Sequence, residues 1–170
     1  MRLVEGSAAV EDVDSFVADL NGIGDEYGVT VQAFDARYVV SRAHLERAVE
    51  LADRAFAREE NVARDRGVEI LLYAAGRRQI DRALTLGVSR GRNPIVVVID
   101  APDRGLEADE AEADAAAAVE GLLDPESTLG ASDEDRVREF FGVGDRELAA
   151  VDGDLADVVL ERVALLDVEK

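Results

Sequence analysis

The sequence predicts an α/β (α+β) fold: a single compact domain, residues 1–170, in which several helices flank a small central mixed β-sheet. Short apolar runs, such as residues 95–99, have the length and composition of strands that are buried on both faces. Longer segments, such as residues 11–27, carry apolar residues at helical spacing. No internal repeat or linker marks a domain boundary, and 170 residues, 48% of them apolar, can form a substantial core.

The N-terminal third alternates between short strands and longer helices. We expect strands at residues 2–5 and 29–34 and helices at residues 11–27 and 41–64. Two glycines, Gly22 and Gly24, are expected to loosen the end of the first helix. Ser41 is a favoured N-cap for the second helix. Small and apolar residues form the inner stripe of that helix, and its outer stripe consists of Arg47, Glu50, Arg54 and Arg58.

The stretch from residue 68 to residue 99 organises the predicted fold, because it reads as strand, loop, helix, loop and strand. Residues 68–73 form an apolar run that only Glu69 interrupts, which favours a buried strand. Gly76 then allows a tight turn. Apolar residues within 80–84 recur at helical spacing, and Gly87 is expected to be the left-handed cap of that helix. The second buried strand follows at residues 95–99.

The remaining segments are predicted to be mainly helical. We expect helices at residues 107–123, 132–141 and 145–150, and a last element that begins near residue 154. Ser132 is the expected N-cap of the second of these helices, and acidic residues crowd its first turn. The valines of the last element also fit a strand, so both interpretations stay open there.

The chain lacks most of the residues that catalysis or metal binding requires. It has no cysteine, which excludes disulfides, thiolate nucleophiles and Cys-based zinc sites. His44 is the only histidine, and we expect it to cap or pack rather than to catalyse. Asp100 is a candidate magnesium ligand at a strand end, although a turn role is more common. No Walker-type or dinucleotide-binding motif is present. We therefore expect a binding or scaffolding protein with no enzymatic activity, no cofactor and no metal.

No membrane span or leader is predicted either. The sequence contains no run of about eighteen apolar residues, which a membrane-spanning helix needs. No basic-then-apolar pattern opens the chain. We expect a cytoplasmic protein.

Charge is unevenly distributed in a very acidic chain. The formal net charge is −19, and 18 of the 19 basic residues are Arg, with Lys170 the only Lys. Abundant carboxylates with almost no Lys indicate adaptation to molar salt, where the Debye length is roughly 3 Å. Residues 37–92 hold 12 Arg and 8 acidic residues, a balance of +4, whereas the remainder holds 7 basic and 30 acidic residues. A basic region that persists in such a protein favours anion binding.

Basic and amide side chains gather on the polar side of the predicted helix and in the loop after it: Arg77, Arg78, Gln79, Arg82, Arg90 and Arg92. Arg78 and Arg82 are four residues apart, which predicts a shared helix face, and Arg77 is spaced to pair with Asp81. Free N–H groups at a helix start, beside several guanidinium groups, suit a phosphate or a carboxylate. The alternative interpretation is an ordinary solvated helix face.

Several stretches together resemble one protein family. They are His44-Leu45, the small residues Ala48, Ala52 and Ala55, Asn61, Glu69-Ile70-Leu71-Leu72-Tyr73, Gly76, Arg78-Gln79-Ile80, Ala83, Gly87, Phe141-Gly142-Val143 and residues 160–166. Over most of its length the chain is similar to the tRNA-recruiting subunit of the archaeal and eukaryotic KEOPS complex, the family of the human PRPK-binding protein. The acidic tract 107–120 lies outside the recognisable pattern.

The resemblance implies a compact α/β domain without enzymatic activity of its own. KEOPS installs threonylcarbamoyl on adenosine 37 of tRNA, and in this family the subunit binds the kinase-like ATPase of the complex and the 3′ CCA end of tRNA. Matching to the family's Arg-Gln-Ile helix implies RNA binding by Arg77, Arg78, Gln79 and Arg82. Charge alone adds Arg47, Arg54, Arg58, Arg90 and Arg92. The alternative is a protein-interaction subunit that regulates the ATPase without binding RNA itself.

Overall fold

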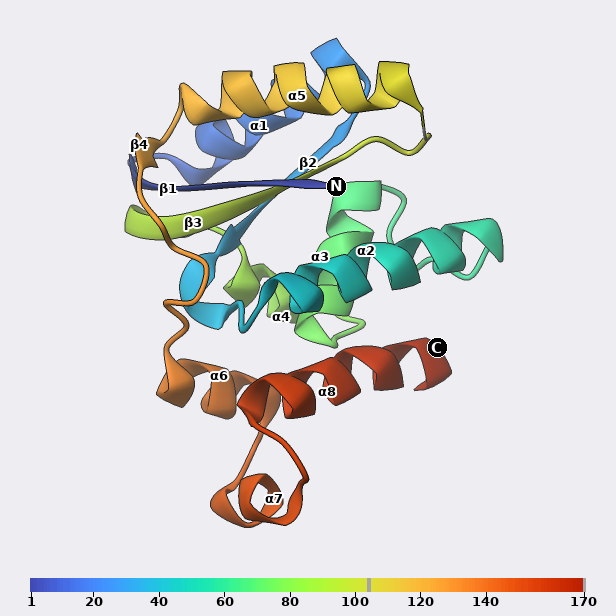
Figure 1. Cartoon of the computed structure of the whole chain (residues 1–170), viewed down its shortest axis with the longest axis vertical. Coiled ribbons are helices and arrows are strands. Elements are labelled where there is room, and N and C mark those ends of the chain that lie inside the picture. Colours follow the sequence, from blue (N-terminus) through green and yellow to red (C-terminus); the bar gives the residue numbers. More distant parts are fainter. Residues whose placement is uncertain (104, 170) are drawn as a thin grey trace. The chain divides into compact units, whose positions relative to one another are not determined.

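The computed structural model describes residues 1–103 and 105–169. The chain divides into two compact units. The sheet unit consists of Met1–Ala36 and Gly87–Thr128, and the helical unit consists of Arg37–Leu86 and Leu129–Lys170. Figure 1 shows the order of the elements, which are four strands and eight α-helices within the described part of the chain. The predicted α+β class is thereby confirmed, and the single domain stays a prediction.

The sheet has four strands in the order β2-β3-β1-β4. They are β1 (Arg2–Val10), β2 (Thr30–Asp35), β3 (Gly91–Asp100) and β4 (Asp124–Pro125). All the pairings are antiparallel, so the expectation of a mixed sheet is wrong. The error has a physical reason: residues 95–99 of β3 are buried on both strand faces, and such a strand has the same apolar composition in an antiparallel sheet as in a parallel one.

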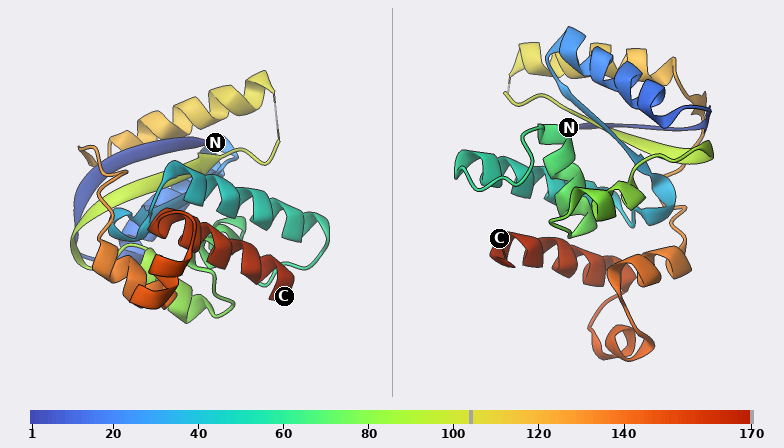
Figure 2. Two further views of the ribbon diagram at one scale, coloured as in Figure 1. Left: turned by 60° about the horizontal axis from the view of Figure 1, so that its bottom comes forward. Right: turned by 180° about the vertical axis from the view of Figure 1, so that it is seen from behind.

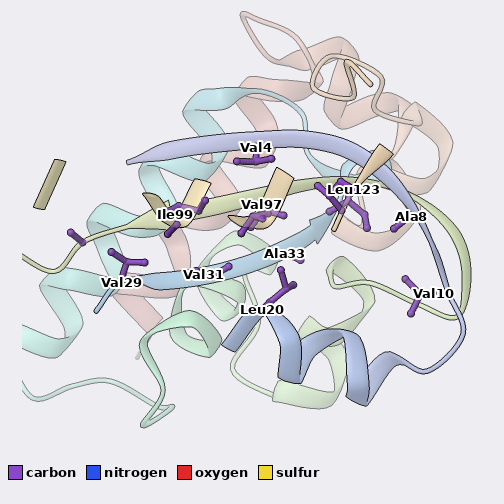
Figure 3. Packing of buried hydrophobic residues seen from close by; sticks show 14 residues of the cluster. Val4, Ala8, Val10, Leu20, Val29, Val31, Ala33, Val97, Ile99 and Leu123 are labelled. Carbon is purple, nitrogen blue, oxygen red and sulfur yellow. The ribbon is translucent and has the colours of Figure 1, made fainter. Parts of the chain in front are cut away.

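Two helices cover one face of this sheet. α1 (Val13–Tyr27) packs against β2 and α5, and α5 (Leu106–Glu120) packs against β1 and β3. The two helices lie side by side in Figure 1 and, seen from behind, in Figure 2. The core beneath them is aliphatic (Figure 3) and includes Val4, Ala8, Val10, Leu20, Val29, Val31, Ala33, Val97, Ile99 and Leu123.

Gly22 and Gly24 do not loosen α1. The helix continues to Tyr27, and Gly28, at a φ of 68°, forms its left-handed cap. Gly24 instead allows a close approach, because a Cβ atom there would lie 2.8 Å from the carbonyl oxygen of Val29. The glycine therefore lets β2 begin directly against the helix that precedes it.

The helical unit contains all the other elements. They are the 3-10 helix η1 (Ala36–Tyr38), which overlaps the unit boundary, α2 (Arg42–Ala57), α3 (Arg66–Ala75), α4 (Ile80–Ala83), the 3-10 helix η2 (Leu84–Leu86), α6 (Glu134–Phe141), α7 (Asp145–Ala150) and α8 (Leu155–Glu169). α2 packs against α3 and α8, and α6 packs against α8. Ser41 caps α2 as predicted, since its Oγ accepts a hydrogen bond from the His44 N–H at 3.2 Å. The helix ends at Ala57 rather than near residue 64, because Glu59 adopts a positive φ of 58°.

The predicted strand at residues 68–73 is wrong, because this run lies inside α3. Asp65 caps its start by accepting a hydrogen bond from the Gly67 N–H at 3.0 Å, and Gly76, at a φ of 61°, caps its end. Every residue from 69 to 75 is buried. A helix that is buried all round loses the polar face that reveals helical periodicity, so its sequence resembles a buried strand.

The C-terminal predictions are largely confirmed. α7 begins and ends where it was predicted, and the last element is a helix rather than a strand. α6 begins one residue later than expected, because Asp133 rather than Ser132 accepts the capping hydrogen bond, from the Arg136 N–H at 3.2 Å. Gly87 is not among the glycines with positive φ, so the left-handed cap expected there is wrong. Within the described residues, no helix combines the length and the apolar character that crossing a bilayer requires.

Candidate functional site

The segment Gly76–Gln79 leaves the C-terminal end of α3 in a fixed conformation. The Gly76 N–H donates to the carbonyl oxygen of Tyr73 at 3.0 Å, and the Arg77 N–H donates to that of Leu72 at 3.1 Å. These two bonds satisfy carbonyls that a helix end otherwise leaves without partners. Gln79 then precedes α4 as its N-cap, although its side chain makes no capping hydrogen bond.

A pocket of about 340 Å³ lies on this segment, lined by Gly76, Arg77, Arg78, Gln79 and Leu166. Leu166, from α8, is almost fully buried. Gly76 lies close to the same helix, since a Cβ atom there would be 3.2 Å from the carbonyl oxygen of Arg162. The pocket therefore combines polar side chains from one segment with one apolar residue of α8.

Arg77 is bound to α6 rather than to Asp81. Its guanidinium donates a hydrogen bond to the carbonyl oxygen of Phe140 and lies 4.9 Å from the centroid of the Phe140 ring. The expected pair with Asp81 is absent from the described contacts, because Arg77 precedes α4 and the spacing rule for a helix face does not apply to it.

Arg78, Gln79 and Arg82 are exposed. None of their side chains forms an ion pair or hydrogen bond with the residues that the structure describes. The expectation that Arg78 and Arg82 share a helix face is wrong, because Arg78 lies in the loop before α4. α4 is only four residues long, so its start also lacks the aligned peptide dipoles of a full helix N-terminus. Any anion held here would depend on side chains.

The predicted RNA-binding arginines of α2 and its C-cap differ in whether a carboxylate already pairs with them. Arg47 pairs with Glu50 at 2.8 Å. Arg54 lies 3.7 Å from Glu50 and 3.5 Å from Asp167 of α8. Arg58, which follows α2, is exposed and makes no ion pair among the described residues. Of these three predicted residues, only Arg58 therefore retains an uncompensated charge.

Arg90 and Arg92 belong to the sheet unit, unlike the other predicted residues. Arg92, in β3, donates to Ser7 Oγ at 2.8 Å and to Asp124 at 3.3 Å. Arg90 is exposed and forms no ion pair with the described residues. The structure thus brings together Arg77, Arg78 and Gln79 at one pocket, places Arg82 on the short helix that follows, and assigns Arg90 and Arg92 to the other unit.

Sequence reasoning missed the residues that support this pocket from a distance. Phe140 and Leu166 follow Arg77 by more than sixty residues and carry no local signal of a site. Asp100, a candidate magnesium ligand, lies 3.1 Å from the N-terminal ammonium group instead. Within residues 1–103 and 105–169, no three His, Cys, Asp or Glu side chains are grouped so that they could hold a metal ion.

Comparison with known proteins identifies the family. No curated protein matches the chain. The family model described as kinase binding protein CGI-121 matches residues 11–167, which is most of the chain and includes the Arg78–Gln79 pocket and most of α8. This match confirms the resemblance to the PRPK-binding protein of KEOPS, and the chain belongs to the kinase-binding protein CGI-121 family.

Proposed function

We propose that this protein is a non-catalytic subunit of a cytoplasmic KEOPS complex. In this proposal it binds the kinase-like ATPase of the complex and the 3′ CCA end of tRNA, and so supports threonylcarbamoylation of adenosine 37. The description of its family, which names kinase binding, supports the protein-binding half of the proposal. The RNA-binding half depends on the pocket.

The observation that carries the RNA-binding half is the composition of that pocket. Single-stranded RNA ends are bound through phosphate contacts and through stacking of bases on aromatic rings or on the planes of arginine guanidinium groups. Arg78 offers an exposed guanidinium, Gln79 offers an amide that can donate and accept, and the nearly buried Leu166 forms the floor of the pocket. A volume of about 340 Å³ suits one or two nucleotides rather than a folded duplex.

Charge pairing ranks the predicted contacts. In a chain with a net charge of −19, an arginine that already pairs with a carboxylate adds little positive potential for RNA. Arg78, Arg82 and Arg58 lack such pairs within the described residues, whereas Arg47 and Arg54 have them. We infer that Arg78 contributes most to RNA binding, Arg82 and Arg58 less, and Arg47 and Arg54 least.

The test is binding of tRNA with and without its terminal CCA to the full chain, in salt that keeps the protein folded. Wild-type protein should prefer the complete tRNA, and Arg78→Glu should weaken binding by roughly tenfold or more, since it removes one phosphate contact and adds repulsion. Arg47→Glu is the control, because it reverses a half-buried charge that Glu50 already compensates. Equal affinity for the two tRNAs would exclude recognition of the CCA end.

A second candidate function is regulation of the ATPase by protein contact alone. It is favoured by the family description, which names a kinase partner and no nucleic acid. Co-purification in high salt with tRNA and the ATPase separates the two functions. Capture of the ATPase by this chain, without retention of tRNA by the isolated chain, would favour the second.

A further inference from the structure

Two arginines bind the C-terminal carbonyl groups of α6. Arg77 donates to the carbonyl oxygen of Phe140, and Arg162 Nε donates to that of Phe141 at 3.3 Å. The last carbonyls of a helix have no partner within the helix and carry its partial negative charge. Guanidinium groups therefore stabilise this helix end, and they also tie other segments to it.

The ring on which Arg77 lies is itself held by other aromatic side chains. Phe140 contacts Phe141 and Tyr38 edge to face, with centroids 5.0 Å and 5.9 Å apart. Phe141 in turn contacts the ring of the buried His44 at 6.0 Å. Arg77 is thus attached to a packed aromatic cluster, and moving its guanidinium would break both a charge-assisted hydrogen bond and a cation–π contact.

The neighbouring residue fixes the same segment from a second direction. Gly76 has a positive φ of 61°, and its backbone approaches Arg162 of α8 so closely that a Cβ atom would lie 3.2 Å from the carbonyl oxygen. Arg162 is held in turn by Glu147, at 2.5 Å and 2.9 Å. The segment Gly76–Gln79 is therefore anchored to both α6 and α8 immediately before its two exposed side chains.

We propose that Arg77 is a positioning residue rather than an RNA contact: it holds the segment Gly76–Gln79 against Phe140 so that Arg78 and Gln79 are presented to a single-stranded RNA end. This inference rests on the proposed function of the pocket. The two adjacent arginines therefore have different roles. Arg78 contacts the ligand with its charge, and Arg77 fixes the backbone conformation that exposes Arg78.

The salt dependence of binding distinguishes these roles. A side chain that neutralises one phosphate of a single strand contributes about 0.7 to the slope of log K against log salt. We expect Arg78→Ala to lower the affinity for tRNA and to reduce the magnitude of the slope by about 0.7. Arg77→Ala should lower affinity for CCA-ended tRNA several-fold and leave the slope unchanged, and Arg77→Lys, which retains a cation and a donor, should recover part of the loss. Arg64→Ala is the control, because it removes an exposed charge of the helical unit that is not among the proposed RNA contacts.

Hydrogen exchange provides a readout that does not depend on RNA. In Arg77→Ala the amides of residues 76, 77 and 83, which donate to the carbonyl oxygens of Tyr73, Leu72 and Gln79, should exchange at least about tenfold faster, while the amides of α2 keep their protection. If Arg77→Ala does not fold, Arg77→Lys is compared with wild type in the same two measurements. The proposal is overturned if loss of Arg77 reduces the slope as loss of Arg78 does, or if the amides keep their protection. If wild-type protein binds no tRNA, the proposed function fails, and the exchange measurement still decides whether Arg77 orders the segment.

Discussion

The Nε2 atom of His44, in α2, donates a hydrogen bond to the carbonyl oxygen of Ala74, in α3, across 2.7 Å. A carbonyl only accepts, so this bond assigns the proton to Nε2. Nδ1 then accepts from the Val40 N–H at 3.4 Å. Both ring nitrogens of the neutral imidazole are therefore bonded to backbone groups, and His44 joins the two helices as a packing residue.

The buried imidazole predicts that acid destabilises the protein. Burial lowers the pKa of His44 from 6.5 to about 4, against a smaller opposing effect of the bond to Ala74. Between these two values the unfolded chain takes up a proton that the folded chain does not. Stability should therefore be unaffected by His44 above pH 6.5 and fall as the pH decreases toward 4, by about 3 kcal/mol in full.

Because His44 is the only histidine, its proton NMR resonances report this titration directly. A midpoint near 6.5 in the folded protein would contradict the prediction. His44→Gln, which does not titrate, should lack this component of the pH dependence and so separates it from the effect of the many carboxylates.

A second prediction concerns Glu69, a fully buried carboxylate in α3. Its Oε1 accepts hydrogen bonds from the N–H groups of Val62 and Ala63 at 3.1 Å and 3.0 Å, and so fixes the loop before the helix. Glu69→Gln keeps one oxygen for these donors but replaces the second, Oε2, which accepts from the Val62 N–H at 3.2 Å, with an NH₂ group, and it removes the charge that strengthens these bonds. We expect a loss of about 2–3 kcal/mol in the free energy of unfolding.

Urea denaturation of Glu69→Gln measures this loss, and Glu60→Gln, at an exposed residue nearby, is the control. Equal stability of the two variants would mean that the loop does not depend on the carboxylate.

α1 and α3 show how far the sequence predicts the fold. α1 has one buried and one solvated face, so its apolar residues recur visibly, and the sequence predicts the start of the helix to within two residues. α3 buries residues 69–75 on all sides, so no helical periodicity is visible and the sequence predicts a strand. Its caps were nevertheless present in the sequence, as Asp65 and Gly76. Capping signals deserve more weight than apolar runs where a segment has no polar face.

The candidate site was predictable only in its local part. Arg78 and Gln79 are adjacent in sequence, so composition and family resemblance both found them. The partners of Arg77 and the apolar wall of the pocket come from α6 and α8, and only tertiary packing brings them there. Likewise, the residues of an ion pair such as Arg54–Asp167 lie more than a hundred positions apart in the sequence. Counting charges along the sequence therefore cannot distinguish arginines that form ion pairs from those that do not.

A third prediction compares two glycines of α1. Gly22 has no atom within 4 Å of an added Cβ, so Gly22→Ala should stabilise the protein by about 0.5–1 kcal/mol through helix propensity. At Gly24 the same change would place Cβ 2.8 Å from the carbonyl oxygen of Val29, a backbone atom, and should destabilise by about 1–3 kcal/mol. Thermal unfolding of the two variants checks the opposite signs. A stabilising Gly24→Ala would show that β2 can move away from α1.

The last prediction concerns salt. Negative charge is concentrated on α5, whose exposed acids include Glu107, Glu110, Asp114 and Glu120. The Debye length grows from roughly 3 Å at 1 M salt to roughly 10 Å at 0.1 M, so repulsion among these carboxylates acts at low salt and is screened at high salt. With a net charge of −19, we expect the melting temperature to fall by roughly 10 °C on transfer from molar KCl to 0.1 M KCl, which corresponds to about 3 kcal/mol. Circular dichroism measures this shift.

A variant in which these four acids are replaced by their amides is the control. Its melting temperature should depend less on salt, whereas a general effect of salt on the hydrophobic core would leave the salt dependence of the melting temperature intact. An unchanged melting temperature at low salt would contradict adaptation to molar salt.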